Sequence, residues 1–192
     1  MAETEAAPTL ISVERYFEFE ECGIIAPDER CELLEGMIVA MLPQTAPHSS
    51  TVYRVEHLLQ DRLGRATVIR VQMSFLAGGR SVPEPDIAVV PGKPEDYYRR
   101  HPSTALLIVE VAHRSVVQDR VTKAAIYASA GIPCYWIVNL RASRVEVFRR
   151  PHPQSAQYLE VSSAVAGQMI EIDAFPGVRC DAGELLLPPF DD

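Results

Sequence analysis

The most constraining feature of this chain is a nearly continuous apolar run at residues 105–111, Ala-Leu-Leu-Ile-Val-Glu-Val. A run of this length without alternating polar residues is typical of a β-strand that is covered on both faces, as in a sheet packed between helices. Glu110 is its one charged residue. A buried carboxylate costs several kcal/mol unless it is paired or binds a cation. Glu110 therefore either pairs with a structural arginine, lies at the exposed end of the strand, or belongs to a site.

The rest of the chain predicts helices on either side of a sheet. Apolar spacing and capping residues predict helices at residues 12–22, 48–63 and 116–130, with Pro47 in a first turn and Gly64 and Gly131 at helix ends. Predicted strands are 31–34, 37–42, 66–71, 74–76, 87–90, 105–111, 134–138, 145–148, 157–161 and 168–172, the first two joined as a hairpin around Glu35-Gly36. This order predicts an α/β fold, a mixed β-sheet flanked by α-helices. We expect one domain over residues 1–192, with a core from about 12 to 184.

Composition indicates a soluble protein of the cytoplasm. The chain has 192 residues, 47% of them hydrophobic, and no apolar run near the roughly 20 residues that a membrane span needs. Residues 1–8 are acidic and Ala-rich, unlike a signal peptide. The four cysteines lack metal-binding spacing, and we expect reduced thiols packed in or near the core: Cys22, Cys31, Cys134 and Cys180.

The net charge of −8 counts against a broad nucleic-acid-binding surface, although a local basic patch remains compatible with it. Two groups are candidates for such a patch: residues 97–101, Tyr-Tyr-Arg-Arg-His, and the arginines Arg141, Arg144, Arg149 and Arg150. The alternative is that both groups are ordinary solvated turns and strand faces.

Asp86 is the natural partner for Glu110. It directly precedes the apolar residues 87–90 and follows Pro85, a residue type common at strand starts. A carboxylate at the start of one buried strand and another near the end of a second can converge across adjacent strands, and two such oxygen ligands suit a hard cation such as Mg²⁺. The alternative for Asp86 is turn chemistry at the start of a strand.

Lys123 lies in the helix predicted after Glu110. At 100° per residue one helix face carries Val117, Val121, Ala124, Ala125 and Ala128. Asp119, Lys123 and Tyr127 form a row on the other side, which is shared with apolar residues and is therefore partly covered as well. Lys123 then either reaches into a site or forms an exposed ion pair with Asp119, worth a few tenths of a kcal/mol.

These residues stand in a pattern that resembles a known family. The segments are PDIAVV (residues 85–90), IVEV (108–111), DRVTKAAIYASAGIPCYWIV (119–138) and, earlier, CELLEGMIVAM (31–41). They resemble the Uma family of restriction-endonuclease-like proteins, part of the PD-(D/E)XK nuclease superfamily, over about residues 12–184. The match departs from the family at residues 112–116, Ala-His-Arg-Ser-Val in place of Leu-Ser-Pro-Ser-Thr, and at Cys31, where an aromatic residue is usual.

The resemblance implies a catalytic set of Asp86, Glu110 and Lys123. Asp86 and Glu110 would bind Mg²⁺ or Mn²⁺, with the backbone carbonyl of Val111 as a third ligand. The superfamily lysine stands two residues after the glutamate, where this chain has Ala112, so Lys123 would replace it from the helix. Glu32 and His48 match family positions near the site and would support it. Arg120 could hold the phosphate backbone of the substrate through its positive charge.

The resemblance also implies a metal-dependent endonuclease that hydrolyses phosphodiester bonds of DNA, acting as a homodimer. Two alternatives remain open on the sequence. One is a catalytically silent nuclease-fold protein that binds nucleic acid or a partner, which the acidic charge favours. The other is a metal-dependent hydrolase of small phosphoesters, which would combine an intact site with an acidic surface.

Overall fold

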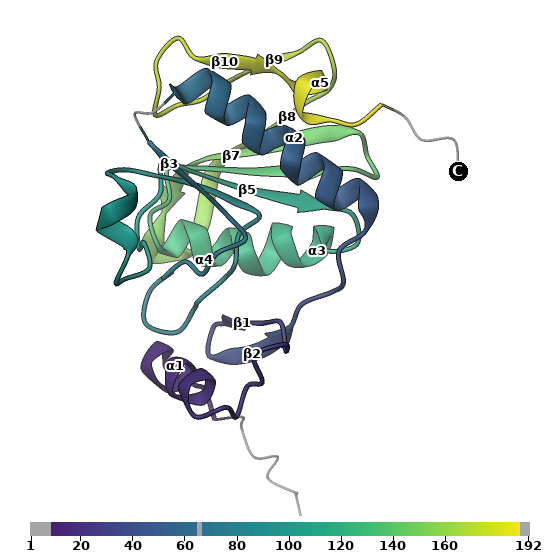
Figure 1. Ribbon diagram of the computed structural model, residues 1–192. Helices are drawn as coiled ribbons and strands as arrows, with labels where there is room; N and C mark the ends of the chain where they lie inside the picture. The colour runs from purple at the N-terminus through teal and green to yellow at the C-terminus, as the bar shows by residue number, and fades with distance from the viewer. Residues whose placement is uncertain (1–8, 65–66, 189–192) are drawn as a thin grey trace, which may run out of the picture.

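The structure, a computed structural model, describes residues 9–64 and 67–188. The acidic N-terminal segment, residues 1–8, lies outside these ranges. Residues 65 and 66 also lie outside them, and the second of these is the first residue of the strand predicted at 66–71. The elements are α1 Val13–Glu21, β1 Cys31–Leu34, β2 Met37–Ala40, α2 Ala46–Leu63, β3 Val68–Val71, β4 Ile87–Val90, η2 Pro94–Tyr97, β5 Leu107–Ala112, α3 Val116–Gln118, η3 Asp119–Lys123, α4 Ala124–Ser129, β6 Cys134–Asn139, β7 Arg144–His152, η4 Pro153–Ser155, β8 Gln157–Ala164, β9 Met169–Glu171, β10 Arg179–Asp181 and α5 Ala182–Leu185. Figure 1 shows their arrangement.

A six-stranded mixed sheet forms the centre of the molecule, with strand order β3-β4-β5-β6-β7-β8. β5 and β6 run parallel, and the other neighbouring pairs are antiparallel. All six residues of β5 are buried, including Glu110. The predicted mixed sheet flanked by helices is confirmed, and the apolar run at residues 105–111 corresponds to its fully covered strand.

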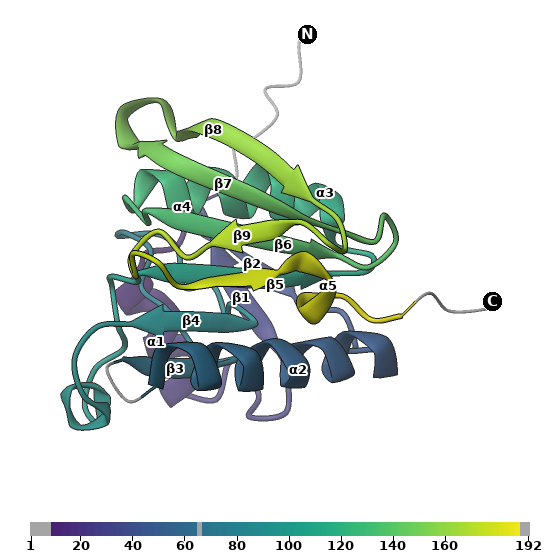
Figure 2. The same cartoon turned by 90° about the horizontal axis from the view of Figure 1, so that it is seen from above.

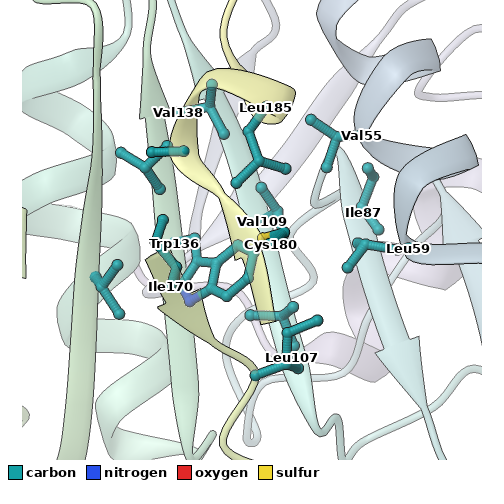
Figure 3. Packing of buried hydrophobic residues seen from close by; sticks show 14 of the residues in the cluster. Val55, Leu59, Ile87, Leu107, Val109, Trp136, Val138, Ile170, Cys180 and Leu185 are labelled. Carbon is teal, nitrogen blue, oxygen red and sulfur yellow. The ribbon is translucent and has the colours of Figure 1, made fainter. Parts of the chain in front are cut away.

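Two layers cover the two faces of this sheet (Figures 1 and 2). On one face lie α2, the small β9–β10 sheet and α5, packed on an apolar core whose largest side chain is Trp136 (Figure 3). On the other face lie α3, η3 and α4, packed on a core that includes Tyr127 and Tyr135. Both sides of β5 are therefore closed to solvent, and its one carboxylate must find partners inside the protein.

An N-terminal unit of α1, β1 and β2 lies beside the face that carries α4 (Figure 1). β1 and β2 form the predicted antiparallel hairpin, although the second strand ends at Ala40 rather than at residue 42. Glu35 and Gly36 both have positive φ, 51° and 83°, as a two-residue hairpin turn requires. A Cβ on Gly36 would lie 2.8 Å from Cβ of Leu10, so this turn position excludes a side chain. The hairpin places Glu32 next to the central sheet.

The helix predicted at residues 116–130 is continuous in the chain but contains a π-turn at η3, Asp119–Lys123. A π-turn takes up one extra residue, so the faces before and after it are offset by about 100° from those of a regular α-helix. Val117 and Val121, predicted on the core face, are 75% and 65% exposed. Asp119, Lys123 and Tyr127 are buried instead. The predicted core face was therefore wrong for the first half of this segment.

Smaller differences lie outside the main sheet. Residues 74–76 do not form a strand, although Phe75 N–H donates to the carbonyl of Pro83. The strand predicted at 168–172 is β9, which pairs with β10 rather than with the central sheet. α2 begins at Ala46, with Pro47 in its first turn and Gly64 at its end, as predicted. In the described parts of the chain, no helix is both long and apolar enough to cross a membrane.

The four cysteines are free thiols. Cys31, Cys134 and Cys180 are buried, as predicted, whereas Cys22 is exposed at the end of α1.

Candidate functional site

Five of the predicted site residues line a cavity of about 280 Å³: Glu32, His48, Asp86, Glu110 and Val111. It lies where β5 approaches its end and β4 begins, because these strands are antiparallel and place Glu110 and Asp86 at the same end of the sheet. Residues 40–45, between β2 and α2, form one wall, and residues 113–118 form another. Glu32, Glu84, Asp86 and Glu110 all line this cavity.

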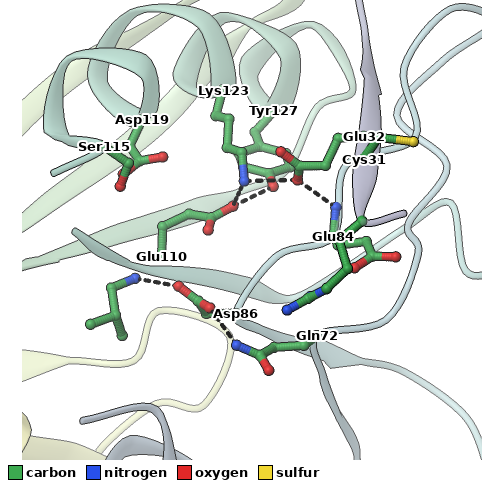
Figure 4. Close-up of polar contacts among 12 residues, drawn as sticks. Cys31, Glu32, Gln72, Glu84, Asp86, Glu110, Ser115, Asp119, Lys123 and Tyr127 are labelled. Carbon is green, nitrogen blue, oxygen red and sulfur yellow. Dashed lines mark hydrogen bonds and ion pairs between the residues drawn. The ribbon is translucent and has the colours of Figure 1, made fainter. Parts of the chain in front are cut away.

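Asp86 is buried, and both of its carboxylate oxygens form hydrogen bonds. Its Oδ2 lies 3.1 Å from Nε2 of His48 and accepts the N–H of Val111 at 2.8 Å. Its Oδ1 accepts the side-chain amide of Gln72 at 3.0 Å (Figure 4). Burial opposes the charge on Asp86, but the hydrogen bonds that it accepts outweigh burial and hold its pKa below the usual value. Asp86 is therefore an oriented carboxylate that stays ionised.

Glu110 is held by two side chains of the helical segment that follows β5, Lys123 and Tyr127. Its Oε1 accepts hydrogen bonds from Nζ of Lys123 at 3.0 Å and from the hydroxyl of Tyr127 at 2.8 Å. Burial raises the pKa of Glu110 well above its usual value, the charge of Lys123 lowers it, and the charge of Asp86 raises it further. Figure 4 shows the carboxylates of Glu110 and Asp86 facing each other. Neither a structural arginine nor an exposed strand end accounts for Glu110.

Lys123 is buried between two carboxylates. Its Nζ lies 3.0 Å from Oε1 of Glu110 and 2.9 Å from Oε1 of Glu32, which also accepts the N–H of Glu84 at 2.7 Å. Burial opposes the charge on Lys123, but the two carboxylates raise its pKa above the usual value. Lys123 thus reaches into the site as a fixed positive charge, and the alternative of an exposed ion pair with Asp119 was wrong.

Asp119 is a further buried carboxylate, one turn before Lys123 on the π-turn. It accepts the hydroxyl of Ser115 at 2.6 Å, and its backbone carbonyl accepts the hydroxyl of Tyr135 at 3.1 Å. Burial raises its pKa from 3.8 to about 6, against the opposing charge of Lys123. The buried row Asp119, Lys123 and Tyr127 therefore supplies the site with three polar groups from one helical segment.

The supporting residues divide into those that reach the site and one that does not. Glu32 and His48 contact Lys123 and Asp86, respectively. Arg120 instead forms a two-pronged ion pair with Glu146, with Nε 2.6 Å from Oε2, and within the described part of the chain it forms no hydrogen bond or ion pair with the predicted catalytic set. Sequence reasoning missed Gln72, whose side chain bonds Asp86, because a glutamine after a short strand carries no recognisable signal.

The donor set fits a hard divalent cation. Carboxylate and carbonyl oxygens are the ligands that Mg²⁺ takes, usually one or two carboxylates with several waters. The N–H of Val111 points to Asp86, and the carbonyl of a strand residue points to the same side as its N–H, which brings the Val111 carbonyl to this corner. No cluster of three or more His, Cys, Asp or Glu side chains suited to a metal occurs among residues 9–64 and 67–188. Two carboxylates and one carbonyl would leave the remaining positions around a Mg²⁺ ion to water.

The sheet, the helices and the paired carboxylates at the sheet's end define a protein of the restriction-endonuclease-like class. The family model described as "Putative restriction endonuclease", Uma2, matches residues 13–183, and the chain belongs to this family. A solved structure described as a putative nuclease belonging to DUF820 from Anabaena variabilis ATCC 29413 has the same fold, with a TM-score of 0.73 at 14% identity over 91% of this chain and 97% of that chain. No protein of curated function matches the chain.

Proposed function

We propose that this protein is a metal-dependent nuclease that hydrolyses phosphodiester bonds of DNA, with Mg²⁺ or Mn²⁺ bound by Asp86, Glu110 and the carbonyl of Val111. The observation that carries the proposal is the pair of buried carboxylates from adjacent strands, facing each other in a cavity, with a buried lysine on one of them. Two facing carboxylates repel each other, and a cation between them would relieve that repulsion.

Each residue has a role that follows from its contacts. Asp86 is held in one orientation by His48, Gln72 and the N–H of Val111, so its oxygens need little reorganisation to bind an ion. A divalent cation bound here would lower the pKa of a bound water and neutralise charge on the phosphate.

Lys123 supplies the remaining positive charge. Its ammonium carries three protons, of which Glu110 and Glu32 take two, so one is left for a water or a phosphate oxygen. Tyr127 donates to the same oxygen of Glu110 as Lys123 does, which leaves the other oxygen for the cation. A lysine acting as a point charge is sufficient to stabilise the charge that develops on a phosphate.

A second candidate function is the hydrolysis of small phosphodiesters. The size of the cavity, about 280 Å³, and the four carboxylates in its wall favour a small ligand over a long polyanion. The two functions use the same chemistry and differ in the substrate that reaches the site.

A cleavage panel tests both functions. Wild-type protein is incubated with Mg²⁺ or Mn²⁺ and plasmid DNA, single-stranded DNA, RNA or bis(4-nitrophenyl) phosphate, and Mn²⁺ binding is measured by calorimetry. We expect divalent-dependent cleavage of DNA, lost in Asp86→Asn and in Lys123→Met, and weaker Mn²⁺ binding in Asp86→Asn. Glu95→Gln, an exposed carboxylate on η2, is the matched control.

The outcomes separate the candidates. Cleavage of the nitrophenyl ester alone would favour the small-phosphodiester hydrolase. No divalent-dependent cleavage of any substrate would contradict both functions and leave a silent nuclease-fold protein. Light scattering on the same samples tests the homodimer that the cutting of two strands would require.

A further inference from the structure

Three segments beside the cavity differ in charge from the rest of the molecule, although the cavity itself is lined by four carboxylates. β5 and β6 end here, β7 begins here, and β8 ends here, as their parallel and antiparallel pairings require (Figures 1 and 2). The three segments at this end, residues 112–118, 139–145 and 162–168, contain no Asp or Glu, although the chain has 26 of them and a net charge of −8. The acidic excess of the protein is absent from these segments.

The same segments carry exposed arginines. Arg114 follows β5, Arg141 follows β6, and Arg144 begins β7; all three are exposed. They lie on neighbouring strands, since Ala112 pairs with Asn139, and Asn139 pairs with Arg144. None of the three forms an ion pair with a residue in the described part of the chain. Three positive charges are therefore exposed at one end of the sheet and free to take an anionic partner.

Besides the carboxylates around the cavity, Glu146 lies close to this end, and it is already paired. It accepts two hydrogen bonds from Arg120 and one from the side-chain amide of Asn139. The charge of Arg144 also contributes to lowering the pKa of Glu146. Glu146 therefore already has partners other than the three exposed arginines.

Several arginines elsewhere have partners within the described part of the chain. Arg149 and Arg150, at the other end of β7, pair with Asp173 and Glu160. Arg62 pairs with Glu184, and Arg54 donates to the backbone carbonyl of Glu184. The basic group at residues 97–101 follows η2 and leads to the start of β5, the end of the sheet opposite to Glu110. Exposed arginines that form no ion pair with a described residue occur elsewhere too, Arg99 and Arg100 among them, but the row that lies beside the cavity is that of Arg114, Arg141 and Arg144.

The row is continuous with the cavity. Arg114 and Gln118 line the cavity wall, and Arg141 and Arg144 lie one and two strands further along the sheet. Two strand spacings are about 10 Å, a distance over which a nucleic-acid strand presents two or three phosphates. A chain whose scissile phosphate entered the cavity beside Arg114 would carry its neighbouring phosphates over this row.

We propose that Arg114, Arg141 and Arg144 form the surface that binds the phosphate backbone of the nucleic-acid substrate beside the active site. The proposal rests on the proposed nuclease function and names its binding surface. Guanidinium groups bind phosphate through paired hydrogen bonds and remain charged at every working pH, which suits sequence-independent contacts. The row explains how a protein of net charge −8 holds a polyanion, through a local patch at one end of the sheet.

A salt-dependent binding experiment tests the surface. Fluorescence anisotropy in EDTA measures the affinity of a labelled 30-base-pair duplex and of single-stranded DNA of equal length over a range of KCl concentrations. The test variant is Arg141→Ala/Arg144→Ala. The matched control is Arg99→Ala/Arg100→Ala, which removes the same charge at the opposite end of the sheet. Hydrolysis of bis(4-nitrophenyl) phosphate with Mn²⁺ reports on the active site itself.

We expect the test variant to lose affinity at low salt on the order of tenfold or more, and its salt slope to fall by about two relative to wild type. The control should bind like wild type, and hydrolysis of the nitrophenyl ester should be unchanged in both. Equal losses in the two double variants would show an effect of net charge alone and overturn the surface.

Failure of the surface and failure of the nuclease function are distinguishable. If wild type cleaves DNA with Mg²⁺ or Mn²⁺ but Arg141→Ala/Arg144→Ala binds DNA as tightly as wild type does, the surface is wrong and the function stands. If wild type neither cleaves nor binds any nucleic acid, the surface and the nuclease function are both overturned.

Discussion

At the scale of single residues, Gln72 is the least expected member of the site. Its φ of 50° places it in the left-handed region, which costs a residue other than glycine roughly 1–2 kcal/mol. Its backbone N–H lies 3.2 Å from the carbonyls of Pro85 and Asp86, and its side chain donates to Oδ1 of Asp86. The strained backbone thus aims the amide at one oxygen of the proposed metal ligand, which makes Gln72 a positioning residue.

Two substitutions separate the effect of the Gln72 side chain on Asp86 from the strain of the Gln72 backbone. Gln72→Ala and Gln72→Gly both remove the hydrogen bond to Asp86, so both should weaken Mn²⁺ binding by about tenfold, measured by calorimetry. Glycine adopts positive φ without strain, so Gln72→Gly should be more stable to urea than Gln72→Ala by about 1 kcal/mol. Gln44→Ala, also in the cavity wall but without a contact to Asp86, is the control. Unchanged Mn²⁺ affinity in both Gln72 variants would exclude the positioning role.

At the scale of elements, a π-turn lies in the helical segment that supplies the site. Residues 119–123 take up one extra residue between α3 and α4, and Asp119, Lys123 and Tyr127 are all buried whereas Val117 and Val121 are exposed. A π-turn within an α-helix is often found at functional sites. In a regular α-helix these three residues would also share one side, spread over about 80°, whereas Val117 and Val121 would share a face with Ala124, Ala125 and Ala128.

Substitutions on the exposed face and on the buried face of this segment should change the free energy of unfolding by different amounts. Val121→Ala should change the free energy of unfolding by less than about 0.5 kcal/mol because Val121 is exposed. Ile126→Ala should cost about 2–5 kcal/mol because Ile126 is buried in the core beneath the sheet. Urea denaturation of the two variants measures both values. A larger cost for Val121→Ala than for Ile126→Ala would contradict the π-turn and favour the faces of a regular helix.

The elements also differ in how well they could be predicted from the sequence. β5, β6 and α2 are long or strongly apolar, so burial and spacing were sufficient to predict them. β9 and β10 have three residues each, and their pairing depends on contacts between distant parts of the chain. Asp86 and Glu110 were predictable as a close pair because they start and end buried strands, although their catalytic roles stay predictions. The partners of Arg120 and Gln72 depend on where β7 and the left-handed turn lie, which no local pattern encodes.

At the scale of the whole molecule, the candidate site is shared between two differently stabilised parts. The N-terminal unit of α1, β1 and β2 packs on a small core of six buried residues, one of which, Val82, lies outside the unit. The core between α2 and the sheet is far larger. Glu32 of β1 pairs with Lys123 across the contact between them, beside the bridge from Leu33 to Val82 and the ion pair of Arg30 with Glu84. Small cores open more readily than large ones, so this unit should open before the rest of the protein unfolds.

The cysteines report this order of opening, because they sit in different parts. Cys31 is in the small N-terminal core, and Cys134 and Cys180 are in the large one. Burial raises the pKa of Cys134 to about 12 and also raises that of Cys31, so each thiol reacts with iodoacetamide only when its surroundings open. Labelling at pH 8, followed residue by residue with peptide mass spectrometry, should modify exposed Cys22 first, then Cys31, and Cys134 and Cys180 last.

The rate ratio between Cys31 and Cys134 is the decisive quantity. If Cys31 reacts well before Cys134, the N-terminal unit opens on its own and carries Glu32 away from Lys123, leaving Glu110 as the remaining partner of that lysine. Equal rates would mean that both thiols become accessible only through global unfolding and that the unit is locked to the sheet. Protein unfolded in urea, where all four thiols should react at similar rates, corrects for intrinsic reactivity. The experiment thus determines whether one of the two carboxylates on Lys123 is a permanent part of the candidate site.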